Sequence, residues 1–497
     1  MFDRRRFLKA LGTAAVSTAF PSIAASPFSL GVASGYPTPG GFTLWTRLGS
    51  PGVVRWEVAA DESFHKIVLA DESTADAAWA NSVHVDIAGL QPDRWYWYRF
   101  LTREGESPVG RTRTAPQTRA PAGRLRFAFA SCQHFEQGWF HAHRHIAADA
   151  PDLVAFLGDY IYESSWGHEH VRKHDRPEPY TLEDYRARHA LYRSDPDLQA
   201  AHAACPWIVT WDDHEVDNDY ADDRPEDGMD RAAFLQRRAA AYRAFYEHMP
   251  LPRFMRPDGP SMRIYTHLDW GVLARFHVLD NRQYRSWHAC PREGRRGGSN
   301  TVNVEECPRL DAPGRSMLGR AQERWLEHSL AQSRAAWNIL AQATTMAQFD
   351  QLPGPGRRAW TDGWDGYPAA RRRLLDFISR SDVSNPVVIG GDVHSFNVTQ
   401  LKLDFDDTAS PAVASEFVGT SITSGAWPQE RMAQYLPDNP HFVFADSRFR
   451  GYTRVDITPR QWRADLRAVE TVKRRDAGCS TLATFLVEDG KPGPVKA

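Results

Sequence analysis

The sequences RFAFASCQHFE (residues 126–136) and PDLVAFLGDYIYE (residues 151–163), separated by a polar segment, decide the fold. Each contains a short apolar run, residues 127–130 and 153–157, which is typical of a strand buried in a parallel sheet. The first run is followed by Cys132, and the second by Asp159 and Tyr162, three side chains able to bind metals. Because ligands gather at the carboxyl ends of strands in open α/β sheets, this stretch predicts a metal centre at one sheet edge.

Strand-like and helix-like patterns alternate from residue 123 to the C-terminus. Further strands are expected at residues 208–211, 272–279, 339–341 and 386–389, and helices within residues 231–249 and 319–337. The alternation predicts an α/β fold of layered mixed sheets flanked by helices. The sequence leaves open whether residues 466–472 form a strand or a short helix, and whether the segment after Trp462 covers the site as a lid.

A small all-β sandwich domain is expected to precede this domain, over residues 27–115. Short runs at residues 41–47, 53–59, 82–87 and 95–100 are separated by turn residues, as in fibronectin type III or immunoglobulin domains. A connector rich in Pro and Ala, residues 114–122, separates the two domains, and the larger one is expected over residues 123–497.

Residues 1–26 have the pattern of an export signal and are not expected to belong to the fold. Basic residues 4–6 and Lys9 precede a mildly apolar run, residues 10–20, and a region of small residues, 23–26. The adjacent arginines followed by Phe-Leu-Lys resemble a twin-arginine signal, the route of substrates that are exported folded. The protein is therefore expected to use the twin-arginine export machinery and to reach the periplasm or the extracellular space.

Composition excludes some classes of protein. The 497 residues carry a formal net charge of −2, without the basic face that nucleic-acid binding requires. No internal stretch approaches the roughly 18 apolar residues of a membrane-spanning helix. Cys290 and Cys307 flank a loop rich in Gly and Arg, and they form a disulfide in an oxidising compartment or remain two free thiols.

Two more expected strands end at acidic residues or histidines. Residues 212–219 (DDHEVDND) follow residues 208–211, and Asp392 and His394 follow residues 386–389. Such a group of thiol, carboxylates and phenol would repel itself unless cations occupied it. Cys and Tyr favour a transition metal, whereas Asp and Asn oxygens favour hard divalent ions. Two ions bridged by Asp159 would suit the transfer of a phosphoryl group to water.

Three motifs, in this order and with Cys132 ahead of them, resemble those of a known family: Gly158-Asp159-x-x-Tyr162, Asp212-Asp213-His214-Glu215 and Gly391-Asp392-x-His394. They are similar to the blocks of calcineurin-like metallophosphoesterases, specifically the PhoD-type alkaline phosphatases. The resemblance implies a metallophosphoesterase-type fold. It also implies a secreted enzyme that hydrolyses phosphomonoesters and phosphodiesters by attack of metal-bound hydroxide on phosphorus, with Fe³⁺ and Ca²⁺ or other divalent ions.

The resemblance also assigns roles to individual residues. Iron would be held by Cys132, Tyr162 and His394, with Asp159 as the bridging ligand; Asp213, Asn218 and Asp392 would lie on the calcium side. Asp212, Asp217 and Asp219 are rivals of Asn218 for its position. His214 would be the catalytic residue that stabilises or protonates the leaving oxygen, and Arg144, Arg282 or Arg285 would hold phosphate oxygens.

Two alternatives remain open at this point. A phosphodiesterase of the same fold, such as a phospholipase D-like enzyme acting on lipid head groups, would share the ligands. A non-catalytic secreted module would use the acidic loops to bind structural calcium, but it would give no reason for Cys132 or for the pair of Asp392 and His394.

Overall fold

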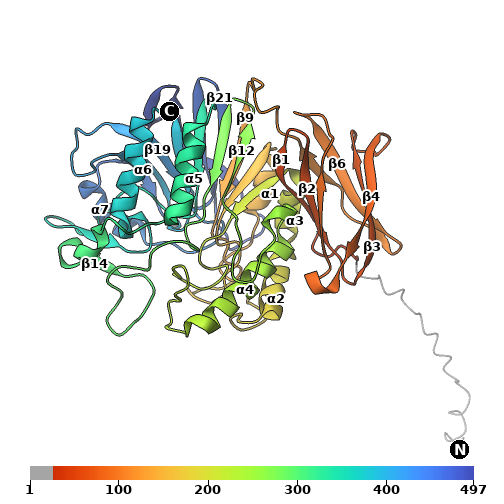
Figure 1. Cartoon of the computed structure of the whole chain (residues 1–497), viewed down its shortest axis with the longest axis horizontal. Coiled ribbons are helices and arrows are strands. Elements are labelled where there is room, and N and C mark those ends of the chain that lie inside the picture. Colours follow the sequence, from red (N-terminus) through yellow and green to blue (C-terminus); the bar gives the residue numbers. More distant parts are fainter. Residues whose placement is uncertain (1–25) are drawn as a thin grey trace, which may run out of the picture.

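The computed structural model describes residues 26–497 of the chain (Figure 1). The predicted export signal, residues 1–26, lies outside the described residues except for Ser26. Among the helices that the structure describes, none is long and apolar enough to cross a membrane.

Two mixed sheets form the centre of the molecule, and the larger one has ten strands. In spatial order these are β24 (Lys491–Lys496), β23 (Cys479–Glu488), β22 (Gln461–Val469), β21 (Arg450–Thr458), β9 (Leu125–Ala130), β10 (Leu153–Leu157), β11 (Trp207–Thr210), β1 (Val32–Thr38), β2 (Gly41–Arg47) and β5 (Ser82–Ile87). Strands β9, β10 and β11 are parallel, with Phe127 opposite Leu153 and Val154 opposite Trp207. Their carboxyl ends therefore lie at the same edge, as the sequence predicts.

The second sheet has seven strands. In order they are β12 (Thr266–Trp270), β13 (Ala274–Val278), β15 (Trp337–Ala341), β17 (Pro386–Gly390), β19 (Ala412–Val418), β18 (Phe396–Lys402) and β20 (Phe442–Asp446). The pairs β13–β15, β15–β17 and β17–β19 are parallel. The predicted strands at residues 208–211, 272–279, 339–341 and 386–389 correspond to β11, β13, β15 and β17.

Aromatic side chains from both sheets pack in one core. The Phe127 ring of β9 lies 5.1 Å from the Phe276 ring of β13 and 5.6 Å from the Trp462 ring of β22. The Phe417 ring of β19 lies 5.7 Å from the same Trp462 ring. Strands β10 and β17 are buried along their whole length, and β9 at every residue except Arg126, so they are almost entirely apolar and recognisable in the sequence.

Helices cover the outer faces of the sheets (Figure 1). They are α1 (Ala142–Ala148), α2 (Leu182–Arg193), α3 (Pro196–Ala204), α4 (Arg231–His248), α5 (Gly319–Ala331), α6 (Pro368–Arg380) and α7 (Gln429–Tyr435). Leu326 of α5 and Leu374 of α6 pack with Leu340 and Val388 of the seven-stranded sheet. The mixed α/β fold class is thereby confirmed, but the helix expected over residues 319–337 was predicted too long. It ends at Ala331, because Trp337 is fully buried as the first residue of β15.

The N-terminal β region shares a sheet with the rest of the molecule. Its second sheet contains β4 (Ile67–Ala75), β3 (Gly52–Ala59), β6 (Trp95–Thr102), β7 (Gly105–Glu106) and β8 (Gly110–Arg113). Strands β1, β2 and β5 instead continue the ten-stranded sheet, through a parallel pairing of Gly35 with Trp207. A Cβ atom on Gly35 would lie 2.4 Å from the carbonyl oxygen of Pro250, so the close approach requires glycine.

The C-terminal segment lies mainly within the larger sheet. The residues left undecided in the sequence, 466–472, are strand up to Val469 as part of β22. Strands β21 to β24 then form antiparallel pairs. The turn after β22 brings Val472 and Lys473 to the rim of a large pocket, and the strands themselves do not form a lid.

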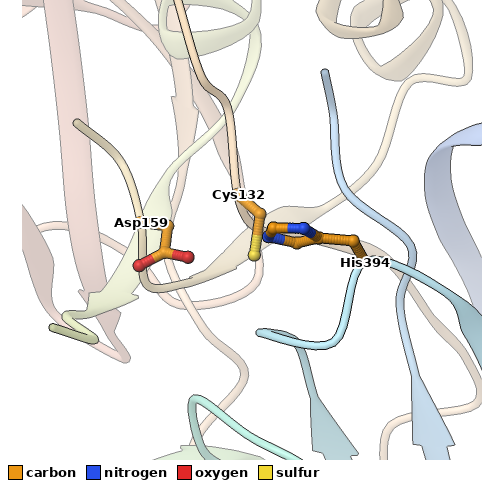
Figure 2. Close-up of side chains that lie close together, drawn as sticks. All are labelled: Cys132, Asp159 and His394. Carbon is orange, nitrogen blue, oxygen red and sulfur yellow. The ribbon is translucent and has the colours of Figure 1, made fainter. Parts of the chain in front are cut away.

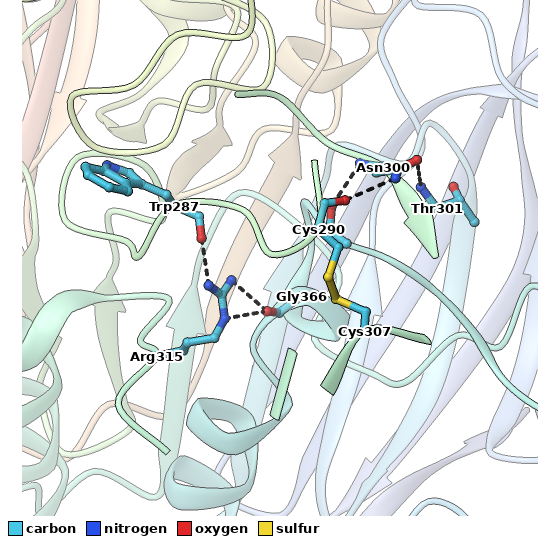
Figure 3. Close-up of a disulfide and its surroundings, with 8 residues drawn as sticks. Trp287, Cys290, Asn300, Thr301, Cys307, Arg315 and Gly366 are labelled. Atoms are coloured by element: carbon cyan, nitrogen blue, oxygen red, sulfur yellow. Dashed lines mark hydrogen bonds between the residues drawn. A yellow bond between two sulfur atoms is a disulfide. The ribbon is translucent and has the colours of Figure 1, made fainter. Parts of the chain in front are cut away.

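Cys290 and Cys307 form a disulfide, with Cα atoms 6.2 Å apart, and are not two free thiols (Figure 3). The amide of Asn300 donates to the carbonyl oxygen of Cys290 at 3.1 Å. Nearby, Arg315 donates to the carbonyl oxygens of Trp287 at 2.7 Å and Gly366 at 3.1 Å. A small two-stranded sheet, β14 (Thr301–Asn303) with β16 (Arg358–Trp360), completes this region.

Candidate metal centre

The segments that follow β9, β10 and β17 bring Cys132, Asp159 and His394 together (Figure 2). The Cys132 sulfur, an Asp159 oxygen and a His394 ring nitrogen all lie within 4.8 Å of one another. The Tyr162 hydroxyl lies 2.9 Å from Asp159 Oδ2 and 3.1 Å from His394 Nε2. The four residues to which the resemblance assigns iron therefore form one cluster.

Asp159 also belongs to a second group of ligands. One of its oxygens, an Asp213 oxygen and a His214 nitrogen lie within 4.8 Å of one another. Its Oδ1 atom is buried and has no hydrogen-bond partner within residues 26–497. A buried carboxylate that belongs to two groups of metal-binding residues, and has one oxygen without a partner, fits a bridging ligand between two cations.

The backbone at four of these residues is in the left-handed region. Positive φ angles occur at Cys132 (60°), Asp159 (55°), Asp392 (68°) and His394 (55°). A non-glycine residue in this region costs on the order of 1 kcal/mol, and such residues cluster at functional sites. The turns after three strands are held in conformations that aim side chains at a common point.

Burial shifts the pKa values of these side chains strongly. Burial, and then the Asp159 carboxylate, raise the pKa of the Cys132 thiol well above its usual range. Burial raises the pKa of Asp159 and of Asp392 well above normal, with Asp212 and Asp213 adding to the effect in both. Burial lowers the pKa of His394 to about 3. A cation would reverse the preference of the thiol and carboxyls for protonation, so this donor set fits a metal.

Arg282 lies among the acidic residues. Its Nε donates to Asp212, Nη1 donates to Asp362 at 2.9 Å, and Nη2 lies 3.3 Å from Asp213. All of these side chains are buried. Nε and Nη1 donate to carboxylates, whereas Nη2 lies near Asp213 and Asp362 without a hydrogen bond, so Arg282 compensates the charge of these carboxylates.

The other two arginines singled out in the sequence have structural contacts. Arg144 donates to the carbonyl oxygen of Arg475 at 2.8 Å on an exposed surface. Arg285 is buried and donates to Asp362 at 2.6 Å and to the carbonyl oxygen of Tyr220 at 2.7 Å. Neither geometry indicates a role in phosphate binding.

His214 is held by a carboxylate that the sequence analysis did not single out. Its Nδ1 lies 2.7 Å from Glu163 Oε2. Burial opposes the charged imidazolium, but Glu163, Asp213 and Asp159 outweigh it and raise the pKa of His214 well above its usual range. His214 is thereby equipped to carry a proton beside Asp159 and Asp213. The only signal for Glu163 was its position directly after Tyr162.

Glu215 fixes the loops that carry the ligands. Its carboxylate accepts backbone N–H bonds from Asp159 at 3.2 Å, Tyr160 at 2.6 Å and Asp212 at 2.9 Å. It therefore ties the turn after β10 to the turn after β11. The motif that contains Glu215 could be recognised in the sequence, but the hydrogen bonds from Glu215 to the turn after β10 could not.

Asn218 and its rivals are engaged in different ways. The Asn218 side-chain amide donates to Glu226, and its backbone N–H donates to Glu163 at 3.2 Å; neither bond involves Asp159 or Asp213. Asp217 pairs with Arg237 at 2.8 Å. The backbone N–H of Asp219 donates to Asp213 Oδ2 at 2.6 Å. The calcium-side role of Asn218 remains a prediction.

A pocket of about 780 Å³ opens beside the cluster. Asp392 and His394 line it, together with a wall of aromatic and apolar side chains: Trp166, Phe349, Trp360, Trp364, Trp427, Met432 and Phe442. The Trp166 ring stacks at 6.0 Å on His394 with an angle of 6° between the planes. The acidic metal-binding residues therefore lie at one side of a largely apolar cavity.

Arg450, also in this pocket, was missed by the sequence analysis. Its Nη1 donates to the carbonyl oxygen of Ser424 at 2.6 Å, and its other contacts are also to neutral oxygens. In the part of the chain that the structure describes, no carboxylate forms a salt bridge with it. Burial lowers its pKa to about 10, so it remains charged at neutral pH. Nothing in the local sequence distinguishes Arg450 from the other arginines.

Comparisons with known proteins identify the family of the chain. Residues 127–466 match the family model described as PhoD-like phosphatase, and residues 14–116 match its N-terminal domain. The chain is 44% identical to alkaline phosphatase D of Bacillus subtilis over 99% of this chain and 88% of that protein. A solved structure titled "Structure of PhoD" superposes with a TM-score of 0.90 at 44% identity, covering 96% of this chain and 93% of that one. The chain belongs to the PhoD-like phosphatase family.

Proposed function

We propose that this phosphatase hydrolyses phosphomonoesters and phosphodiesters in a reaction that depends on Fe³⁺ and Ca²⁺. The observation that carries the proposal is the position of Asp159, which belongs both to the group with Cys132 and His394 and to the group with Asp213 and His214. Thiolate, phenolate and imidazole are ligands for iron, whereas carboxylate and amide oxygens are ligands for calcium.

The ligands divide between the two cations as follows. Cys132, Tyr162 and His394 would hold iron, Asp159 would be shared, and Asp213, Asn218 and Asp392 would hold calcium. When bound, the ions supply Lewis acidity, which activates water and neutralises the charge of the phosphoryl group. The buried Asp159 Oδ1 atom without a partner supports the presence of at least one such ion.

Protein side chains would complete the reaction. His214, charged and held by Glu163, would protonate the leaving oxygen of the ester. Glu215 would keep the backbone turns of Asp159 and Asp212 fixed. Arg450, a cation with only neutral partners in the described chain, would stabilise the negative charge on the phosphoryl oxygens.

The apolar pocket favours phosphate esters that carry a large apolar alcohol group. Trp166, Trp427 and Phe442 offer contact area to an apolar alcohol group, and phosphoryl oxygens alone would not use it. Diesters and esters with a large apolar alcohol are therefore expected to be better substrates than small alkyl monoesters.

Export through the twin-arginine machinery to the periplasm or beyond is part of the proposal. The disulfide between Cys290 and Cys307 supports it, because disulfides persist in oxidising compartments. Replacing Arg5 and Arg6 by Lys should keep the enzyme in the cytoplasm, as measured by fractionation. Export of that variant at the normal level would reject the twin-arginine route.

One experiment tests the activity and the ions together. The exported enzyme is analysed for metals by plasma mass spectrometry and assayed with p-nitrophenyl phosphate, bis-p-nitrophenyl phosphate and phosphatidylcholine. Iron together with calcium, and release of p-nitrophenol from both synthetic esters, are expected. Calcium alone without turnover would favour a binding module, and turnover of phosphatidylcholine alone would favour a phospholipase.

A further inference from the structure

A second group of metal-binding side chains lies beside the candidate metal centre and shares no residue with it. It consists of His134, Glu136, His170 and His174, the histidine–glutamate cluster. Ligand atoms of His134, Glu136 and His174 lie within 4.8 Å of one another. His170 Nδ1 and His174 Nδ1 each lie 3.8 Å from Glu136 Oε2.

The cluster joins two segments that are distant in sequence. His134 and Glu136 follow β9, just after Cys132, whereas His170 and His174 lie in the long connection between β10 and α2. That connection begins after Leu157 and carries Asp159, Tyr162, Glu163 and Trp166. The His134 ring packs at 4.6 Å against the Tyr162 ring, so the cluster adjoins the candidate metal centre.

The outward-facing atom of each histidine is already held. His170 Nε2 bonds to the carbonyl oxygen of Trp166 at 2.9 Å, and His174 Nε2 bonds to the Tyr192 hydroxyl at 3.1 Å. His134 Nδ1 accepts the backbone N–H of Glu136 at 3.2 Å. Histidines that bind metals are oriented by donating their second ring N–H, and the bonds of His170 and His174 are compatible with this. For His134 Nε2 to bind an ion, Nδ1 would have to carry the proton and give up its bond to the Glu136 N–H.

The inward-facing atoms are left without hydrogen bonds to one another. His134 is fully buried, and its Nε2 has no partner among residues 26–497. The 3.8 Å separations from Glu136 are too long for hydrogen bonds. Two ligands of a tetrahedral zinc ion lie about 3.3 Å apart, given bond lengths of about 2.0 Å, so His134, Glu136 and His174 would have to move inward to close on an ion. His170 lies outside this group of three and would have to move further, and Glu136 Oε2 would exchange its bond from Ser165 for the ion.

A path for the ion is also present. A cavity of about 360 Å³ is lined by Glu136, Glu163, Ser165 and His174, together with Arg176 and Glu178. The His170 side chain, 22% exposed, lies at the outer edge of the cluster. An ion can therefore reach Glu136 from solvent without passing through the candidate metal centre.

We propose that His134, Glu136 and His174, with His170 as the fourth ligand, bind a zinc ion that clamps the β10–α2 connection to the segment after Cys132. Three imidazoles and one carboxylate are a ligand set that zinc takes in proteins. The ion would close a long loop and fix the segment that carries Glu163 and Trp166.

Zinc content tests the site separately from activity. The full-length exported enzyme carrying Asp159→Asn, which weakens the candidate metal centre, is dialysed against zinc with excess calcium and analysed by mass spectrometry. It should retain one zinc per chain. Adding Glu136→Gln or His170→Ala should remove that zinc, whereas adding His168→Ala, in the same loop but outside the cluster, should not. Equal zinc in all four proteins would overturn the proposal.

Proteolysis tests the clamp in the otherwise unmodified enzyme. Lys173 is exposed in the clamped loop and provides a trypsin site. Zinc at one hundred times its Kd should slow cleavage after Lys173 by about 100-fold, because only the open loop is cut. Glu136→Gln and His170→Ala should lose this protection and His168→Ala should keep it. Cleavage that zinc leaves unchanged in the wild-type enzyme would also overturn the proposal.

Discussion

Four residues of the candidate metal centre, Cys132, Asp159, Asp392 and His394, have left-handed backbone conformations. Each follows an apolar strand and turns sharply at the sheet edge. Each such conformation costs on the order of 1 kcal/mol, so contacts with the surrounding structure must stabilise it. Glu215 contributes by accepting three backbone N–H groups from the turns after β10 and β11.

Replacing Asp159 by Asn should remove iron and calcium together. The amide keeps the side-chain volume but lacks the charge that two cations share, so turnover should fall by more than about 1,000-fold. Metal analysis and hydrolysis of p-nitrophenyl phosphate measure the two effects. Asp71→Asn, at an exposed position on β4, is the control and should leave both unchanged. An Asp159→Asn enzyme that turned over without its metals would refute the mechanism.

Replacing His214 by Gln should affect esters according to their leaving group. A general acid matters most for an alkoxide, so alkyl phosphates should lose about 100- to 10,000-fold in kcat, and p-nitrophenyl phosphate much less. Glu163→Gln removes the carboxylate that stabilises the protonated form of His214. It should also lower kcat more for alkyl phosphates than for p-nitrophenyl phosphate, but by a smaller factor than His214→Gln. Equal losses for both kinds of ester would show that His214 has another role.

The sequence was sufficient for the site residues that follow apolar strands. Cys132, Asp159 and His394 could be expected together because β9, β10 and β17 are recognisable as buried strands. Arg282 and Arg450 could not be placed, because their roles depend on contacts with residues far away in the chain. Glu163 directly follows a motif, but its pairing with His214 depends on the fold.

At the scale of elements, strands that are apolar throughout were predictable, and so were the mixed strands β2, β3, β5 and β6, which lie between turn residues. The exposed strand β4 escaped notice because its burial pattern is almost entirely exposed or intermediate. The end of α5 was misplaced, because Trp337 fits an amphipathic helix as well as a buried strand. Only the pairing of β15 with β13 and β17 distinguishes the two.

The disulfide is expected to stabilise its loop and not the catalytic chemistry. Cys290 and Cys307 are separated by 17 residues, and a closed loop of this length contributes about 3 kcal/mol in the chain-entropy treatment. The Cys290→Ser/Cys307→Ser double variant should therefore have a lower Tm in calorimetry, with kcat for p-nitrophenyl phosphate unchanged. Cys205→Ser, at a buried free cysteine, is the matched control for loss of a thiol. An unchanged Tm in the double variant would show that the bridge adds no stability.

At the scale of the whole molecule, several buried histidines make stability depend on pH. Burial lowers the pKa of His84 to about 4, and those of His143, His189 and His277 to about 3. In the unfolded chain these groups titrate near pH 6.5, so the unfolded state binds more protons below that pH. Their contribution is complete above pH 6.5 and is lost as the pH falls toward 3 or 4.

We therefore expect Tm to decrease steadily from pH 7 to pH 4. His84 alone accounts for about 3 kcal/mol of this loss. His84→Asn keeps a donor for the carbonyl oxygen of Leu251 and should be less stable than wild type at pH 7, with a shallower pH dependence. Calorimetry across this pH range measures both. A variant with the same slope as wild type would mean that His84 is not the titrating group.

The pairing of β1 with β11 limits how far the chain can be shortened from its N-terminus. Tyr36 donates to the carbonyl oxygen of Val209 at 2.9 Å, and Trp45 donates to that of Glu247 at 3.0 Å, so strands β1 and β2 cover one flank of the hydrolase core. In a fragment starting at residue 123, β11 would become an exposed edge strand. Its unpaired backbone N–H and C=O groups could then pair with another copy of the fragment and cause aggregation. A shortened version of the enzyme should therefore retain the N-terminal strands, because they cover the edge of β11.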